Sequence, residues 1–205
     1  MNKLILGSIM SFLAGFLLVS RPVAAQETGF VSNFSLQDPD GRAVSLDQYK
    51  NDKVVVVVFT SSNCVWATKY QDRLTALHTQ YHSKGVRFLA INSNDAAMSQ
   101  RDAVSRMAVV SPYPFPYLKD DSQQVARLFG AEKTPETFVL VPREGRFSIA
   151  YRGKIDDNPI DPKLVRSNYL VDALDSVLVG KPPRIAHEPA NGCFIKWKET
   201  VVDNN

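Results

Sequence analysis

Cysteine has the strongest potential for chemistry in this chain, because its thiolate is both a nucleophile and a redox centre. The 205-residue sequence contains two, Cys64 and Cys193. Cys64 lies five residues after Phe59, where an apolar run ends and a helical pattern begins. The free N–H groups and partial positive charge of a helix N-terminus favour a thiolate and lower its pKa. This position predicts a reactive thiol; the alternative is a structural cysteine, because free cysteines are often buried.

Cys193 follows Gly192 in a polar C-terminal tail that contains one apolar cluster, Phe194, Ile195 and Trp197. It could resolve a mixed disulfide or a sulfenate on Cys64, so that the two form one redox pair. It could instead form a permanent bridge, and closing so long a loop adds about 4–5 kcal/mol in the chain-entropy model. In a third arrangement the thiols remain apart. We expect an intramolecular disulfide in some state of the working protein, formed by a mobile tail that folds back.

The other polar groups are weaker candidates for chemistry. His78 and His82 stand one helical turn apart without an evident third ligand, so a solvated helix face is the simpler interpretation. Asp156 and Asp157 could form a carboxylate pair, but their sequence is first of all a loop signal. The sequence has no phosphate loop and no dinucleotide fingerprint, and we expect neither a metal nor an organic cofactor. Three polar residues that could line the site follow the second strand of the pattern described next: Asn92, Asn94 and Asp95.

The elements that position Cys64 follow from the spacing of apolar residues. Residues 54–59 form an unbroken apolar run, which predicts a central strand with both faces covered. From Trp66 to Tyr81 the apolar residues recur every three or four positions, which predicts one long helix that ends before Gly85. A second buried strand over 86–91 completes a β-α-β unit. Reactive groups collect at the carboxyl ends of such strands, where Cys64 lies.

The rest of the chain supplies further elements around this unit. Short runs on either side of residues 38–41 (Asp-Pro-Asp-Gly) predict a β-hairpin. Helices are expected over 98–109 and from Ser122 to Phe129, and residues 136–141 and 147–151 predict a second hairpin. Apolar residues from Leu164 to Leu178 predict a last helix. The fold class is α/β, with a central mixed sheet and helices on both faces.

The first 25 residues predict a cleaved signal peptide, and the alternative is an uncleaved membrane anchor. Lys3 precedes a mostly apolar run over 4–19, and residues 23–25 (Val-Ala-Ala) are typical of a cleavage site. We therefore expect an exported protein, periplasmic or secreted, with no stable membrane association after cleavage. Disulfides persist in that environment. Cleavage removes Lys3 and Arg21, so the formal charge falls from +3 to +1. A net charge this small does not favour binding to nucleic acid.

Six segments occur in an informative order: residues 56–64 (Val-Val-Val-Phe-Thr-Ser-Ser-Asn-Cys), 90–95 (Ala-Ile-Asn-Ser-Asn-Asp), 115–120 (Phe-Pro-Tyr-Leu-Lys-Asp), Thr134-Pro135, 151–158 (Tyr-Arg-Gly-Lys-Ile-Asp-Asp-Asn) and 192–197 (Gly-Cys-Phe-Ile-Lys-Trp). Together, over about residues 30–198, they resemble the thioredoxin superfamily, and within it a redoxin-type, peroxiredoxin-like branch related to the alkyl hydroperoxide reductase/thiol-specific antioxidant group. The resemblance implies a thioredoxin-like fold in which Pro135 is cis and, with Thr134, forms the substrate-facing wall opposite Cys64.

The chain departs from that branch immediately after Cys64. The branch usually has Cys-Pro-Tyr where this chain has Cys64-Val65-Trp66. Ala67 excludes a Cys-x-x-Cys pair, and it fills the position of the peroxide-reactive cysteine in peroxiredoxins. The Pro-x-x-x-Thr-x-x-Cys pattern is also absent, because Val57 replaces its proline. The resemblance therefore does not carry over the peroxiredoxin catalytic residue.

Two hypotheses from different classes follow. The first is an exported thioredoxin-fold thiol oxidoreductase, of antioxidant or peroxiredoxin-like activity, with Cys64 as the reactive thiol and Cys193 as its resolving partner. It would act on a protein thiol or disulfide, or on a hydroperoxide. The second is a noncatalytic binding module in which Cys64 is buried or permanently bridged. In either case we expect a leader over 1–25, a thioredoxin-like domain over 26–180 and a tail over 181–205.

Overall fold

The computed structural model describes residues 29–109 and 112–199, so the predicted leader lies outside the described residues. The strands are β1 (Phe30–Val31), β2 (Ser35–Gln37), β3 (Ala43–Ser45), β4 (Val54–Phe59), β5 (Val86–Asn92), β6 (Tyr117–Lys119), β7 (Lys133–Thr134), β8 (Glu136–Arg143), β9 (Arg146–Gly153), β10 (His187–Glu188) and β11 (Cys193–Phe194). The helices are α1 (Val65–Lys69), α2 (Gln71–His82), α3 (Val104–Val109), α4 (Gln124–Phe129) and α5 (Tyr169–Leu178), with 3-10 turns η1 (Leu46–Tyr49), η2 (Gln100–Asp102) and η3 (Pro162–Leu164). In this part of the chain no helix has the length and apolar character needed to cross a membrane.

The main sheet is mixed, in the order β1-β9-β8-β4-β5-β6-β2-β3, with β10 paired to β9. At its centre β4 pairs in parallel with β5 and antiparallel with β8. All six side chains of β4 are buried, as the unbroken apolar run predicts. The expected α/β class, with a central mixed sheet, is confirmed.

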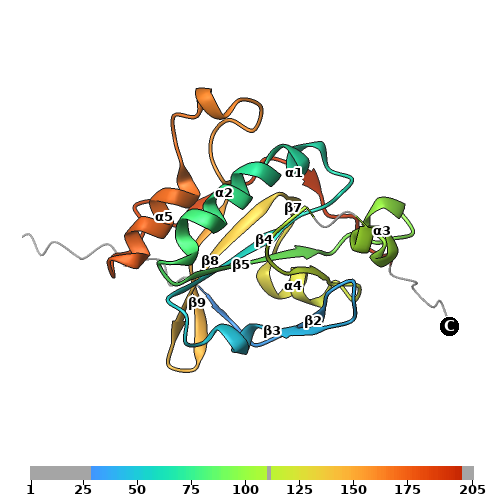
Figure 1. Cartoon of the computed structure of the whole chain (residues 1–205), viewed down its shortest axis with the longest axis horizontal. Coiled ribbons are helices and arrows are strands. Elements are labelled where there is room, and N and C mark those ends of the chain that lie inside the picture. The colour runs from blue at the N-terminus through green and yellow to red at the C-terminus, as the bar shows by residue number, and fades with distance from the viewer. Residues whose placement is uncertain (1–28, 110–111, 200–205) are drawn as a thin grey trace, which may run out of the picture.

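Side chains of β4 alternate between two cores, because successive residues of a strand point to opposite faces. Its even-numbered residues share one core with Leu74 of α2 and Leu170 of α5. Its odd-numbered residues share the other with Phe129 of α4 and Ile195 of the tail. Figure 1 shows α2 and α5 on one side of the sheet and α4 on the other. Each fully buried large apolar side chain contributes about 1.5–3 kcal/mol.

Both predicted hairpins are present. β2 and β3 pair antiparallel around the turn at residues 38–41, and β8 and β9 pair antiparallel around residues 144–145. The predicted end of the helix at Phe129 is also confirmed, since the next residue, Gly130, ends α4 with a left-handed φ of 62°. These elements depend on local signals, namely strand alternation and turn residues, and such signals can be detected in the sequence.

Three predicted helices differ from the structure. The helix expected from Trp66 to residue 84 is divided at Tyr70, whose N–H bonds to the Ala67 carbonyl three residues back and tightens the turn. The segment 98–109 is divided into η2 and α3, because the Asp102 side chain turns inward to buried donors described below. Leu164 lies outside α5, in η3, where the Asp161 side chain accepts a hydrogen bond from the Lys163 N–H.

The paired histidines of α2 do not both lie on a solvated face. His82 is exposed, but His78 is half-buried, with its ring centroid 5.8 Å from that of Phe88 and 5.1 Å from that of Phe115. The His78 Nδ1 atom is buried without a hydrogen-bond partner. Burial lowers the pKa of His78 below its ordinary value, and the nearby His82 and Arg87 act in the same direction.

This lowered pKa predicts a loss of stability in mild acid. Protonation of His78 is easier in the unfolded chain, so its contribution is present above about pH 6.5 and is lost as the pH falls towards the folded pKa. Between about pH 7.5 and pH 5.5 we expect the free energy of unfolding to fall less in a His78→Phe variant than in the natural protein. Urea titrations at both pH values measure this difference.

The control for that experiment is His187→Phe, which makes the same change at an exposed position. It should retain the pH dependence of the natural protein. Equal pH dependence in the natural protein and in His78→Phe would show that His78 protonation does not contribute to the loss.

Candidate functional site

Cys64 and Cys193, 129 residues apart in sequence, are joined by a disulfide. Their Cα atoms are 5.9 Å apart, within the range that a disulfide spans. In Figure 1 the red strand β11, which carries Cys193, lies beside α1, which begins directly after Cys64. Of the three arrangements left open by the sequence, the structure therefore has the two cysteines paired rather than apart.

Cys64 lies at the end of a short loop that leaves the carboxyl end of β4. It is the N-cap residue of α1, and its carbonyl oxygen accepts a hydrogen bond from the Thr68 N–H at 3.0 Å. Its side chain is 1% exposed. In the disulfide form, Cys64 therefore lies at the strand end, the position that predicts a reactive thiol. It is also buried, as the alternative of a structural cysteine predicts.

The Thr134–Pro135 bond is cis, as the resemblance implied. The Thr134 carbonyl oxygen lies 3.0 Å from the Cys64 Sγ atom. Thr134 also pairs with Cys193, since β7 and β11 form a two-stranded antiparallel ladder in which these two residues are partners. The Thr134 hydroxyl donates to the Cys193 carbonyl oxygen at 3.4 Å. The wall that the resemblance assigns to a substrate is thus covered by the protein's own tail.

Gly192 allows the tail to come this close. A Cβ atom at position 192 would lie 2.1 Å from the Thr134 carbonyl oxygen and 2.7 Å from its carbon, distances at which the backbone must move. Glycine is the residue that permits such close backbone approach. The glycine before Cys193 is therefore required sterically, because it lets the tail backbone approach closely enough for Cys193 to reach Cys64.

In the disulfide form the tail is held on both sides of Cys193. Before it, β10 pairs with β9. After it, Ile195 is 3% exposed within the core, and its N–H donates to the Glu132 carbonyl oxygen at 2.9 Å. The Lys196 N–H donates to the Asn94 Oδ1 atom at 2.8 Å, and the Gln123 amide donates to the Lys196 carbonyl oxygen at 2.8 Å.

A buried carboxylate, Asp102, organises the polar groups behind the disulfide. It has no exposed surface, and it accepts hydrogen bonds of 2.6–2.8 Å from five groups: the Ser61 hydroxyl, the Ser62 N–H, the Asn92 amide, the Asn94 amide and the Ser99 hydroxyl. Burial opposes the charge of Asp102, but the hydrogen bonds outweigh it and hold its pKa below the ordinary value.

This cluster connects the two cysteine-bearing segments. Ser61 and Ser62 belong to the loop that ends at Cys64, whereas Asn94 also accepts the hydrogen bond from Lys196 in the tail. Lys119 lies beside the cluster and donates to the Asn94 carbonyl oxygen, and burial lowers its pKa. The polar network thus supports both cysteines without contacting either sulfur through a hydrogen bond.

The other sequence candidates take different roles. Asn92 and Asn94 contribute to the Asp102 cluster, and the Asp95 N–H donates to the Lys196 carbonyl oxygen, so all three support the site from behind. Asp156 is buried, accepting a hydrogen bond from the Tyr70 hydroxyl at 2.6 Å and pairing with Arg73. It stabilises the loop between β9 and α5, and it does not join Asp157 as a carboxylate pair at Cys64.

Sequence reasoning missed three residues of the site: Asp102, Ser61 and Gln123. Asp102 and Gln123 stand in polar segments with no motif around them, and their burial depends on contacts with distant strands. Ser61 could have been noticed, because it lies in the strand-to-helix turn before Cys64. For the other two, the sequence of a single chain contains no signal that separates them from surface residues.

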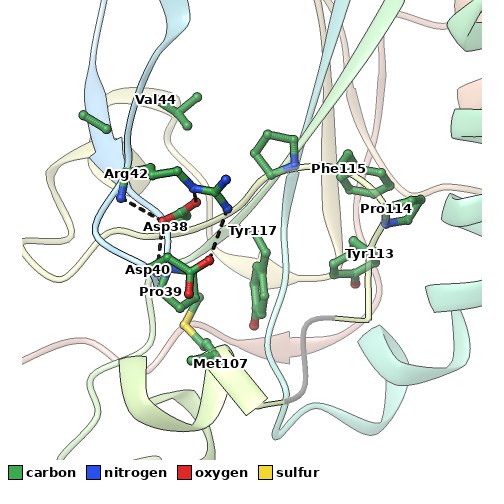
Figure 2. A pocket seen from close by; sticks show the side chains of 13 residues that line it. Asp38, Pro39, Asp40, Arg42, Val44, Met107, Tyr113, Pro114, Phe115 and Tyr117 are labelled. Atoms are coloured by element: carbon green, nitrogen blue, oxygen red, sulfur yellow. Dashed lines mark hydrogen bonds and ion pairs between the residues drawn. The ribbon is translucent and has the colours of Figure 1, made fainter.

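A separate cavity of about 590 Å³ lies beside the β2–β3 hairpin (Figure 2). Arg42 at its edge pairs with both Asp38 and Asp40, as the dashed lines show. The hydroxyls of Tyr113 and Tyr117 in its wall bond to Thr60 and Ser62 of the loop before Cys64. These polar groups are occupied within the chain, and the cavity wall includes no cysteine. The disulfide is therefore the site to which we assign chemistry.

Comparison with known proteins agrees with this fold. A model of the AhpC/TSA family matches residues 30–157. Peroxiredoxin Q of Oryza sativa subsp. japonica is 30% identical over 115 residues, which are 53% of this chain and 51% of the relative. The thiol-disulfide oxidoreductase ResA of Halalkalibacterium halodurans is 22% identical, over 63% of this chain and 70% of the relative. This chain thus spans about half the length of the peroxiredoxin Q relative.

A solved structure covers more of the chain, including part of the C-terminal region. It is an uncharacterized conserved protein from Geobacillus kaustophilus, 34% identical, with a TM-score of 0.78 over 86% of this chain and 94% of that one. At lower identity, 20%, peroxidoxin BcpB of Mycobacterium tuberculosis has a TM-score of 0.50 over 75% of this chain and 90% of that one. The expected thioredoxin-like fold is confirmed. The family match ends before Cys193, so the partner of Cys64 is a feature outside the matched region.

Replacement of Gly192 by alanine should separate the cysteines. The added Cβ atom cannot fit against the Thr134 carbonyl, so the tail must shift and the effective concentration of Cys193 at Cys64 falls. We expect the dithiol of Gly192→Ala to close at least about tenfold more slowly than that of the natural protein. Alkylation and mass spectrometry at intervals after mild oxidation measure the rate. Gly29→Ala, where no atom lies within 4 Å of the added Cβ, should close normally; normal closure in Gly192→Ala would contradict the steric argument.

Replacement of Asp102 by asparagine should destabilise the protein even though the two side chains have similar shape. The amide cannot accept all the hydrogen bonds that the carboxylate accepts, so buried donors lose their partner, at about 2–4 kcal/mol. Urea unfolding of the oxidised protein measures this loss. Asp40→Asn, which affects a surface ion pair with Arg42, is the matched control and should cost less than about 1 kcal/mol. Equal stability of the two variants would contradict the central role of Asp102.

Proposed function

The chain belongs to the AhpC/TSA family, and on that premise we propose that it is a thiol oxidoreductase whose working pair is Cys64 and Cys193. The observation that carries the proposal is the position of this pair: a strand-end cysteine bonded to a second cysteine, against a cis proline. Names of relatives also support it, since they include peroxiredoxins and thiol-disulfide oxidoreductases.

In the proposed reaction the dithiol form reduces its substrate by two electrons. The Cys64 thiolate attacks one sulfur of a substrate disulfide, forming a mixed disulfide and releasing one substrate thiol. The Cys193 thiolate then attacks Cys64 Sγ, which forms the intramolecular disulfide and releases the second thiol. With a hydroperoxide, Cys64 would instead attack the terminal oxygen, releasing an alcohol or water and leaving a sulfenate. Cys193 would condense with that sulfenate and release water.

The residues around the two cysteines contribute to this reaction in two ways, as a wall beside Cys64 and as positioning groups. Thr134 and Pro135 form the wall beside Cys64, and the Thr134 carbonyl oxygen can accept a hydrogen bond from the Cys64 thiol in the dithiol form. Gly192 and the Asp102 cluster are positioning groups, because they act on the placement of the cysteines. Nothing in this scheme requires a metal or an organic cofactor, because thiol exchange and sulfenate condensation use the two sulfurs alone.

Export is part of the proposal. The predicted leader over 1–25 supports it, and so does the disulfide, since disulfides persist mainly in oxidising compartments. The corresponding organisation is a thioredoxin-like domain over 26–180 that carries its resolving cysteine on a tail over 181–205. An intact mass of the protein recovered from the cell envelope fraction, with a first residue near Gln26, would support it.

A second candidate function is a noncatalytic module with a structural disulfide. The burial of Cys64 and the attachment of the tail on both sides of Cys193 favour it. The two functions differ in how readily the disulfide is reduced, because structural disulfides resist the glutathione pool. Redox behaviour therefore separates them.

We expect the pair to equilibrate with glutathione buffers at a potential above about −300 mV, the region below which structural disulfides lie. Alkylation with a mass-labelled maleimide after equilibration counts the free thiols, and both cysteines should appear together. Retention of the disulfide in fully reduced glutathione, in a protein that remains folded, would favour the structural module.

Single variants distinguish the substrate classes. If a hydroperoxide is the substrate, Cys193→Ser should stop at a sulfenate on Cys64, which dimedone labels, whereas Cys64→Ser should not consume peroxide. If a protein disulfide is the substrate, Cys193→Ser should instead retain a mixed disulfide with its partner on Cys64. Equal peroxide and disulfide reduction by Cys64→Ser and the natural protein would contradict the assignment of Cys64 as the nucleophile.

A further inference from the structure

An asparagine followed by a glycine lies directly before Cys193, and it is the single Asn-Gly sequence in the chain. Asn191 is exposed and lies outside helices and strands, and Gly192 lies in a bend. Among the described residues, the Gly192 N–H donates no backbone hydrogen bond. Glycine has no side chain to shield this N–H, so its nitrogen is accessible to the Asn191 side chain. The pair therefore meets the requirements for ring closure between a side-chain amide and the next backbone nitrogen.

The backbone around Asn191 is held on both sides. Before it, β10 pairs with β9, and Ala190 is buried. After it, Gly192 lies so close to the Thr134 carbonyl that no Cβ atom fits between them, and the disulfide fixes the residue that follows. Asn191 is thus an exposed link between two fixed points. Because the protein interior is close-packed, extra length in this link must displace one of those points.

We propose that Asn191 is a site of spontaneous deamidation and isomerisation, which the disulfide form protects and the dithiol form exposes. The Gly192 nitrogen attacks the Asn191 Cγ atom and forms a C–N bond. The bond from Cγ to the side-chain nitrogen breaks, and that nitrogen leaves as ammonia with the proton from Gly192. Water, the sole co-reactant, then opens the succinimide ring at either carbonyl. One opening gives aspartate, and the other gives isoaspartate, in which the main chain runs through the former side chain.

The disulfide restricts the first step of this reaction. Ring closure requires rotation about the Asn191 Cα–C bond, which turns the Gly192 nitrogen towards the side chain and moves the residues that follow. In the disulfide form this rotation is opposed by the covalent bond from Cys193 to Cys64, one residue beyond Gly192. In the dithiol form only noncovalent contacts hold the tail, and such contacts open locally at a lower free energy than global unfolding. The nitrogen therefore reaches the side chain more often in the dithiol form.

Isoaspartate at position 191 separates the two cysteines. It lengthens the main chain by one C–C bond, about 1.5 Å, in a segment whose ends are fixed. The Cα atoms of Cys193 and Cys64 are 5.9 Å apart, and a disulfide does not span more than about 7 Å. A shift by the added length exceeds that margin. Since isoaspartate does not return to asparagine, a chain left in the dithiol form loses its cysteine pair irreversibly. This modification goes beyond the proposed function, because it requires no substrate.

The test compares the two redox forms of the full chain in mildly alkaline buffer, one kept reduced with dithiothreitol and the other oxidised. Peptide mapping measures amide loss at Asn191, and isoaspartyl methyltransferase labels the isoaspartate. We expect loss to be at least about threefold faster in the dithiol form. Asn168, also exposed but followed by Tyr169, is the internal control and should stay intact in both forms. Equal rates in the two forms, or an intact Asn191 in both, would overturn the proposal. Loss of the folded circular dichroism spectrum on reduction would assign the acceleration to global unfolding, and would overturn it too.

A second measurement tests the effect on the cysteines. The aged dithiol form is reoxidised, and the remaining thiols are alkylated before peptide mapping. Isoaspartate should be at least about fivefold enriched in Cys193 peptides with an alkylated thiol, compared with those joined to Cys64. Asn191→Gln, whose longer side chain closes the ring far more slowly, should re-form its disulfide as a fresh sample does. Equal isoaspartate in both peptide pools would overturn the link to pairing. The glutathione test of the proposed function is independent, so the two failures are distinguishable.

Discussion

A carboxylate without exposed surface is stable in its charged form only when hydrogen-bond donors surround it, and Asp102 meets this condition through groups from separate segments. The donors come from the loop before Cys64, from the end of β5 and from the turn that begins at Ser99. If any one of these segments moved, a buried charge would lose part of its compensation. The charge therefore fixes the relative positions of the segments, and the cysteine loop is one of them.

The tail extends this constraint to the second cysteine. Asn94 donates to Asp102 through its amide nitrogen and accepts from Lys196 through its amide oxygen, so one side chain links the buried charge to the segment after Cys193. Gly192 then lets the preceding backbone pass close to Thr134. Because both cysteines are held by the folded chain, the conformational entropy of bringing them together is lost during folding rather than during the redox reaction. The same arrangement buries Cys64 and leaves Cys193 half-buried.

The predictive power of the sequence depended on how local each signal was. The buried strand β4 and the two hairpins follow from apolar alternation and turn residues, and they were predicted correctly. The division at Tyr70 was not, because it accompanies a side chain that enters the core and donates to Asp156 in a distant loop. The inward turn of Asp102 was missed for a similar reason, since two of its donors, Ser61 and Ser62, lie 41 and 40 residues away in the chain.

The sequence by itself determined that Cys64 follows a central strand and that Cys193 lies on a tail, because these placements depend on residue types and their spacing along the chain. It left open whether the cysteines pair. Only the tertiary structure decided that point, together with the unequal burial of the two cysteine residues and the covering of Thr134 by β11. These features depend on the pairing of β7 with β11, in which the partners Thr134 and Cys193 are 59 positions apart, and on a buried charge. Such long-range contacts are a property of the packed molecule, and no local pattern encodes them separately.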